Sequence, residues 1–179
     1  MSERVALIGL SGAGKTTVAP KVAARLRCDW IDLDREIARA AGVDAVGALI
    51  RREGEAAFRA REAEALRRVL EVDPRPRLVV ACGAGALSLR ENRDRLRDGA
   101  LTIWLRVTPG LAAERLGAAP EDDRPLLEGD APEARLHALW EARRADYEAA
   151  ATAVVDTEGK TADEVAERVA AAVREAGWA

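Results

Sequence analysis

Cysteine and histidine are scarce in this sequence of 179 residues. The two cysteines, Cys28 and Cys82, lie far apart, and His137 is the only histidine. Because no Cys-x-x-Cys pair or His/Cys cluster occurs, we expect neither a Cys/His metal centre nor a disulfide-stabilised secreted domain. We assign His137 to no site.

Long apolar runs are also missing, and the first apolar stretch begins at Val5. A membrane-spanning helix needs about 20 apolar residues, and the residues before Val5 are too few for a signal peptide. The net charge of -3 and the isoelectric point near 5.4 argue against nucleic-acid or membrane partners. We therefore expect a cytoplasmic protein.

Lysine is the third scarce residue, since only Lys15, Lys21 and Lys160 are lysines among 28 basic residues. Arginine is correspondingly abundant, and most arginines of a globular protein lie on the solvated surface. A single arginine in this chain therefore indicates little unless its neighbours place it.

One stretch carries a specific motif. Residues 9–16 fit the pattern G-x-x-x-x-G-K-S/T, between a strand-like run, Val5–Ile8, and a helix-compatible stretch, Val18–Leu26. In such a loop the backbone N–H groups surround the phosphates of ATP, the lysine reaches the β- and γ-phosphates, and the hydroxyl ligates Mg²⁺. A chance glycine-rich turn would not explain the flanking strand and helix. The motif assigns nucleotide binding to Gly12, Ala13, Gly14, Lys15, Thr16 and Thr17, with Thr16 as a metal ligand.

Strand-like runs alternate with helical stretches along the chain. This order predicts a three-layer α/β/α fold with a five-stranded parallel sheet, in a single domain spanning residues 1–179. Ligands of such sheets bind beyond the carboxyl ends of the strands. The predicted strands are Val5–Ile8, Trp30–Leu33, Leu78–Cys82, Leu101–Arg106 and Ala153–Val155.

Two carboxylates lie at the end of the second predicted strand. Asp32 and Asp34 are two residues apart, so at a strand end they point to the same side. Asp32 is placed to hold Mg²⁺ through water, and Asp34 to accept a hydrogen bond from an acceptor hydroxyl. The alternative is that one of them only caps a helix beginning at Arg35.

A long helical region, residues 43–70, is broken by Gly54. Within it, Glu62 stands three positions after Arg59, a spacing that can orient the guanidinium. Arg59 then either grips a substrate anion or belongs to a solvated helix face. The spacing alone favours the solvated face, because further arginines follow.

Small residues at the end of the third strand, Gly83-Ala84-Gly85, would let a ligand approach the backbone closely. An ordinary tight turn is the alternative. A later helix carries Arg143-Arg144, in which Arg143 either meets substrate or forms part of a basic surface pair. Spacing alone favours the surface pair.

A helix opens at Thr108-Pro109 and is expected to end near Gly117. The stretch that follows, approximately residues 117–130, is rich in Gly, Pro and acidic residues, as is typical of a mobile lid. Arg124 stands in it, where it could swing onto a transferring phosphoryl group.

Together these residues resemble the shikimate kinases, small P-loop kinases of the nucleoside-monophosphate-kinase-like group. The specific matches are Ile31-Asp32-Leu33-Asp34, Gly54-Glu55-x-x-Phe58-Arg59-x-x-Glu62, Arg124-Pro125-Leu126-Leu127, and Arg143 four residues before Tyr147. The resemblance covers residues 5 to about 165.

The resemblance implies roles that spacing does not give. Asp34 would hydrogen-bond the ring hydroxyls of shikimate, and Arg59 and Arg143 would bind its carboxylate, reversing the surface interpretations above. Arg124 would come from the lid, while Arg115 and Lys160 would lie on the adenine side. The loop Gly83-Ala84-Gly85 matches a three-glycine run of the family, with Ala84 in the middle position, and the proline of its Arg-x-Pro-x-Tyr motif is replaced here by Ala145.

The predicted activity is therefore ATP- and Mg²⁺-dependent phosphorylation of the 3-hydroxyl of shikimate in aromatic amino acid biosynthesis, by a monomer. Lys15, Asp34 and Arg124 are the predicted catalytic residues, and Thr16 and Asp32 the predicted metal site. One alternative is another small-molecule kinase, acting on gluconate, a related carboxylated polyol or a nucleoside monophosphate. Another is a nucleotide-binding module without catalysis.

Overall fold

The computed structural model describes residues 3–118 and 132–178. Five strands form one parallel sheet in the order β2-β3-β1-β4-β5, which confirms the predicted α/β architecture. The strands are β1 (Arg4–Ile8), β2 (Asp29–Asp32), β3 (Leu78–Ala81), β4 (Leu101–Arg106) and β5 (Ala153–Asp156).

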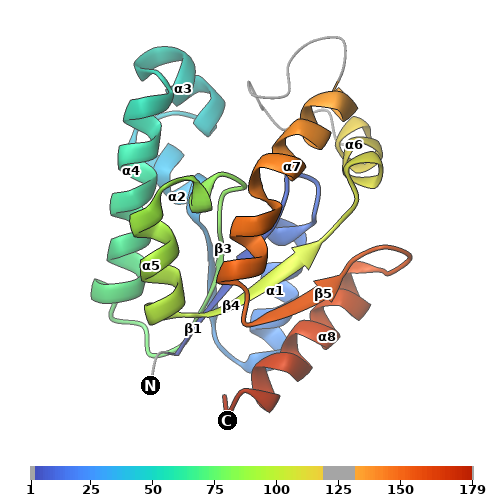
Figure 1. The fold of residues 1–179 in the computed structure, drawn as a ribbon. Coiled ribbons are helices and arrows are strands. Elements are labelled where there is room, and N and C mark those ends of the chain that lie inside the picture. The colour runs from blue at the N-terminus through green and yellow to red at the C-terminus, as the bar shows by residue number, and fades with distance from the viewer. Residues whose placement is uncertain (1–2, 119–131, 179) are drawn as a thin grey trace.

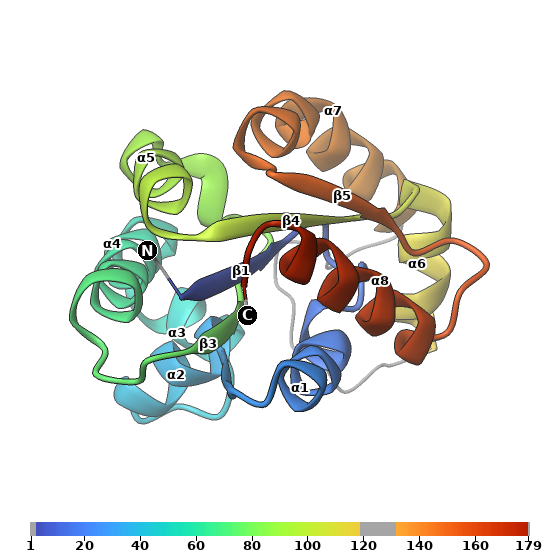
Figure 2. The same ribbon diagram turned by 90° about the horizontal axis from the view of Figure 1, so that it is seen from below.

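Both faces of the sheet are buried along its central strands β1, β3 and β4, as near-continuous apolar strands require. Val5 and Leu7 of β1 belong to one apolar cluster, and Ala6 and Ile8 belong to the other. The first cluster includes residues of α1 (Lys15–Leu26) and α8 (Ala162–Glu175), and the second includes residues of α4 (Glu55–Arg67), α5 (Arg90–Gly99) and α7 (Pro132–Ala150). Figure 2 shows α5 and α7 on one side of the sheet and α1 and α8 on the other.

The sheet edge that carries the strands' carboxyl ends lies away from the two chain termini (Figure 1). Two predicted helix boundaries are confirmed, since Gly54 separates α3 (Val46–Glu53) from α4 and Thr108 caps α6 (Pro109–Gly117). A π-helix that was not predicted, η1 (Arg68–Val72), extends α4.

The end of β2 differs from its predicted position. The strand ends at Asp32, whose carboxylate accepts a hydrogen bond from the backbone N–H of Arg35, so α2 (Leu33–Ala40) begins directly after it. Asp34 therefore lies in the first turn of a helix and not on a strand. The helix begins this early because the Asp32 carboxylate caps it, accepting a hydrogen bond from an N–H group that the first helical turn otherwise leaves without a partner.

A buried arginine fixes the other end of the sheet. Arg4 donates hydrogen bonds to the carbonyl oxygens of Val69 (3.1 Å), Asp73 (2.8 Å) and Pro76 (3.3 Å). The first of these carbonyls lies in η1 and the other two lie between η1 and β3, so a single side chain anchors the connection between α4 and the sheet.

The predicted lid at approximately residues 117–130, with Arg124, falls almost entirely outside the described residues. Within residues 3–118 and 132–178, no helix has the length and apolar character needed to cross a membrane.

Candidate active site

The phosphate-binding motif forms a tight loop between β1 and α1. Gly12 has a φ of 80°, and a Cβ there would lie 2.7 Å from the carbonyl oxygen of Ala112 in α6. Gly14 precedes α1 in a left-handed conformation and provides no side chain to cap it. The positive end of α1 is therefore presented to a ligand, as an anion site requires.

Two side chains at the start of α1 face this loop and the second strand. The Lys15 ammonium group donates to the carbonyl oxygens of Gly9 (2.7 Å) and Leu10 (3.0 Å). The Thr16 hydroxyl donates to Oδ2 of Asp32 at 2.5 Å. Since Oδ1 of Asp32 caps α2, this one carboxylate both caps a helix and faces the hydroxyl predicted to ligate Mg²⁺.

A cavity of about 790 Å³ opens at the carboxyl edge of the sheet. It is lined by every predicted site residue that lies in the described part of the chain, which leaves out only Arg124. These residues are Gly12, Ala13, Gly14, Lys15, Thr16, Thr17, Asp32, Asp34, Arg59, Gly83, Ala84, Gly85, Arg115, Arg143 and Lys160.

The acid groups of the cavity converge on Gly83. A Cβ on Gly83 would lie 2.7 Å from both Oδ1 of Asp34 and Oε1 of Glu62. Both oxygens are buried and have no hydrogen-bond partner among the described residues. Burial, with the nearby charges of Glu62 and Asp32, raises the pKa of Asp34 from 3.8 to about 7, against the opposing charges of Lys15 and Arg59.

Arg59 lies beside these acids and is not on a solvated helix face. Its side chain is 12% exposed and forms an ion pair with the fully buried Glu62 at 2.8 Å. A second pair joins it to Glu55 at 3.2 Å, and a Cβ on Gly85 would collide with the guanidinium. The predicted orientation by Glu62 is confirmed, and the surface interpretation favoured by spacing is wrong. Burial raises the pKa of Glu62, although the pairing with Arg59 opposes this.

The wall opposite α4 comes from α7. Arg143 Nη1 and the Tyr147 hydroxyl both donate to the carbonyl oxygen of Ala84, at 3.0 Å and 2.8 Å. The two residues are four positions apart and so share one face of the helix. Arg143 is thus turned toward the cavity, and its interpretation as half of a surface pair is wrong.

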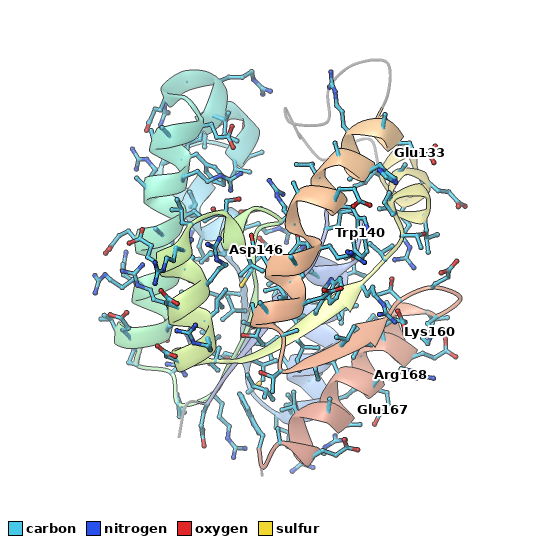
Figure 3. All side chains as sticks on the ribbon, in the orientation of Figure 1. Glu133, Trp140, Asp146, Lys160, Glu167 and Arg168 are labelled. Carbon is cyan, nitrogen blue, oxygen red and sulfur yellow. The ribbon has the colours of Figure 1, made fainter. Side chains whose placement is uncertain are left out.

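The other end of the cavity is formed by α6 and the loop after β5. Arg115 donates to the Thr157 hydroxyl (3.0 Å) and to the carbonyl oxygens of Thr157 (2.9 Å) and Gly12 (3.4 Å). Lys160, labelled in Figure 3, donates to the carbonyl oxygen of Glu158 at 3.0 Å. Thr157, which follows β5 and is buried, was not predicted, because no motif or spacing in the sequence marks it.

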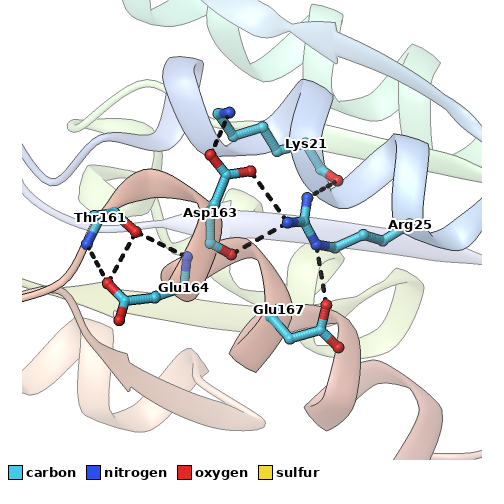
Figure 4. Close-up of polar contacts among 6 residues, drawn as sticks. All are labelled: Lys21, Arg25, Thr161, Asp163, Glu164 and Glu167. Carbon is cyan, nitrogen blue, oxygen red and sulfur yellow. Dashed lines mark hydrogen bonds and ion pairs between the residues drawn. The ribbon is translucent and has the colours of Figure 1, made fainter.

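Ion pairs hold α8 against α1 behind this loop (Figure 4). Asp163 pairs with Lys21 at 2.8 Å and with Arg25 at 3.1 Å, and Arg25 also pairs with Glu167 at 3.1 Å. Thr161 and Glu164 form the predicted capping box at the start of α8. The pairs are exposed and individually weak, but they join the helix that follows Lys160 to the helix that begins at Lys15.

The chain is similar to proteins of known activity. The family model described as shikimate kinase matches residues 11–174. The shikimate kinase of Burkholderia pseudomallei (strain 1710b) is 40% identical over 153 residues, covering 86% of this chain and 80% of the relative. The shikimate kinase of Marinomonas sp. (strain MWYL1) is 35% identical over 170 residues, covering 95% of this chain and 91% of the relative.

Solved structures agree with this match. A shikimate kinase from Acinetobacter baumannii in complex with shikimate has a TM-score of 0.90 and 29% identity, covering 99% of this chain and 96% of that one. A gluconokinase from Sinorhizobium meliloti 1021 has a TM-score of 0.62 at 18% identity, covering 98% of this chain and 93% of that one, and shares the fold alone.

Proposed function

The chain belongs to the shikimate kinase family, and we propose that it transfers the γ-phosphoryl group of ATP to the 3-hydroxyl of shikimate. The observation that carries this proposal is a buried carboxylate oxygen of Asp34 that has no hydrogen-bond partner within residues 3–118 and 132–178, in a cavity that also holds the phosphate loop and two arginines. A ring hydroxyl of the acceptor satisfies that oxygen, and shikimate 3-phosphate and ADP are the products.

Arg59 and Arg143 select the acceptor through its carboxylate. Both guanidinium groups line the cavity from opposite helices, and planar guanidinium groups bind carboxylates through paired hydrogen bonds. The backbone of residues 83–85 lies between them and supplies the floor of the acceptor site. A neutral sugar leaves this positive charge unmatched, which favours a carboxylated ring over a neutral polyol.

Asp34 orients the hydroxyl and takes its proton. As the hydroxyl oxygen bonds to the γ-phosphorus, the bond from that phosphorus to the β–γ bridging oxygen breaks, and the proton passes to the carboxylate. A pKa of about 7 suits a group that must accept this proton near neutral pH.

Lys15 supplies positive charge to the transferring phosphoryl group, which passes through a loose transition state and depends on positioning and charge neutralisation. To do so, its ammonium group leaves the loop carbonyls for the phosphates. Arg124 from the lid contributes a second positive charge in this proposal, and Arg115 and Lys160 contact the adenine side of the nucleotide.

The residues at the start of α1 fit a hydrated Mg²⁺ site. The Thr16 hydroxyl and the Asp32 carboxylate are oxygen donors of the kind that Mg²⁺ prefers, and they lie next to the phosphate loop. No cluster of three acidic, His or Cys side chains able to hold a metal occurs in the described part of the chain. Thr16 would ligate the ion directly and Asp32 through water, and the ion would neutralise charge on the β- and γ-phosphates.

We place this reaction in the cytoplasm, within aromatic amino acid biosynthesis. One chain supplies every predicted site residue that lines the cavity, so the proposed reaction requires no residue of a second copy, and we propose that the protein acts as a monomer.

A panel of acceptors tests the proposal. ADP release is measured with ATP and Mg²⁺ in the presence of shikimate, quinate, gluconate, a nucleoside monophosphate or no acceptor. We expect ADP release to depend on shikimate, and the Lys15→Ala variant to lose it. Equal or greater stimulation by gluconate or a nucleotide would make the protein another small-molecule kinase, and nucleotide binding without stimulation by any acceptor would make it a non-catalytic module.

A further inference from the structure

The loop that forms the acceptor side of the cavity is held from behind by side chains of α5 and α7. Asn92, which is fully buried, donates to the carbonyl oxygen of Ala86 at 2.9 Å, and Arg93 donates to that of Leu87 at 2.6 Å. Arg93 also donates to the carboxylate of Asp146 of α7 at 3.4 Å, and Figure 3 labels Asp146 on that helix. The carbonyl of Ala84 receives the two donors from α7. The carbonyls of residues 84, 86 and 87 thus receive hydrogen bonds from side chains of two separate helices.

Tyr147 differs from the other donors because its side chain packs in the apolar core and carries a single polar group, the hydroxyl. The residue is 1% exposed, and its ring stacks on Trp104 with centroids 5.7 Å apart. Trp104 in turn contacts Trp140 at 5.6 Å. The aromatic packing therefore fixes the hydroxyl at one point, 2.8 Å from the carbonyl oxygen of Ala84.

The hydroxyl remains a donor over the working pH range. Burial raises the pKa of Tyr147 to about 12, even though the positive charge of Arg143 opposes the increase. A phenol that keeps its proton donates one hydrogen bond, and the geometry directs this bond at Ala84.

Resting on the function proposed above, we propose that Tyr147 is a positioning residue for acceptor binding, acting through the Ala84 carbonyl on the 83–85 loop and on Arg143. In the structure, Arg143 and Tyr147 share this one acceptor atom. When Arg143 turns its guanidinium to an acceptor carboxylate, Tyr147 keeps the carbonyl satisfied. Without the hydroxyl, Arg143 must choose between the loop and the substrate, because leaving a carbonyl without a donor is unfavourable.

Tyr147→Phe tests this with the ring packing retained. The matched control is Thr102→Val, which also removes a buried hydroxyl. Thr102 lies near the start of β4, away from the carboxyl ends of the strands, and its hydroxyl donates to the carbonyl of Leu96 at 3.4 Å. We expect Tyr147→Phe to raise the KM for shikimate about fivefold or more, the scale of one lost hydrogen bond, with the KM for ATP within about twofold of the parent. Thr102→Val should leave both KM values unchanged.

A double-mutant cycle with Arg143 distinguishes a positioning role of Tyr147 from a general loss of rigidity. In an Arg143→Ala background the additional effect of Tyr147→Phe on shikimate affinity should fall below about twofold, because the residue through which it acts is gone. Equal effects in both backgrounds, or an unchanged KM for shikimate in the single variant, would overturn the proposal.

The tyrosine can also be observed without mutation, because it is the only tyrosine in the chain. Incorporated 3-fluorotyrosine labels position 147 alone and serves if Tyr147→Phe does not fold. We expect shikimate to shift its fluorine resonance, and no shift at saturating shikimate would contradict the proposal. A parent protein without shikimate-dependent ADP release would refute the proposed function itself, whereas a parent with normal activity and a silent Tyr147→Phe would refute only the positioning role.

Discussion

Replacing Asp34 with Asn should make the protein more stable and much less active. Oδ1 of Asp34 and Oε1 of Glu62 both lie near Gly83, and neither has a hydrogen-bond partner in the part of the chain that the structure describes. The ionised form is therefore disfavoured by burial and by a like charge. An amide removes that charge, and its N–H group can donate to the neighbouring acid.

The size of the effect follows from the pKa. Because the pKa of Asp34 is about 7 in the folded protein against an ordinary 3.8, the folded state binds this proton more tightly than the unfolded chain. The free energy of unfolding then falls as the pH rises from about 4 to about 7, by at most about 4 kcal/mol. The buried amide keeps part of the desolvation cost, so we expect Asp34→Asn to gain about 2 kcal/mol at about pH 8 and little at about pH 4.

Urea unfolding across this pH range measures the difference, with Asp29→Asn as the control. Asp29 is an exposed residue at the opposite end of β2, where the same substitution should leave stability and its pH dependence unchanged. Turnover of Asp34→Asn should fall about 100-fold or more, the usual scale for a lost acid–base group. A variant no more stable than the parent at about pH 8, with the same pH dependence, would refute the electrostatic reasoning.

Three further substitutions separate binding from folding. Arg59→Ala should raise the KM for shikimate at least about tenfold, the scale of a lost charge-assisted hydrogen bond. Arg61 is an exposed arginine on the same helix, and Arg61→Ala should leave this KM unchanged. The same KM for shikimate in both variants would remove Arg59 from the site. Gly83→Ala should fold, since the φ of Gly83 lies outside the left-handed region. It should weaken acceptor binding, because the added methyl group would meet the buried oxygens of Asp34 and Glu62. An unchanged affinity for shikimate by calorimetry would contradict this expectation. Arg4→Met should cost about 3 kcal/mol in urea unfolding through its three lost hydrogen bonds, with kinetics unchanged, and a loss of activity without a loss of stability would contradict the structural role.

The local features of this chain were predictable from its sequence. The phosphate loop is a contiguous motif. Gly54, Thr108 and the Thr161–Glu164 capping box are helix start and stop signals, whose effect depends only on the neighbouring backbone. The strand order β2-β3-β1-β4-β5 depends instead on which strands pair across the sheet, and the parallel sheet alone was predicted.

Long-range partners explain the errors. Spacing along α4 cannot show that Arg59 turns inward, because that depends on Glu62 being buried against the end of β3. The predicted strand ran one residue too far because Asp32 caps α2, so that Leu33 already belongs to the helix. The hydrogen bond from Tyr147 to Ala84 joins residues 63 positions apart, so no local sequence pattern predicts it.

The most direct test of the central claim is a crystal structure of the protein with ADP and shikimate bound. We expect the nucleotide phosphates on the loop before Lys15, the shikimate carboxylate between Arg59 and Arg143, and a ring hydroxyl on Oδ1 of Asp34. Shikimate bound outside the cavity, or bound with its carboxylate turned away from both arginines, would contradict the claim.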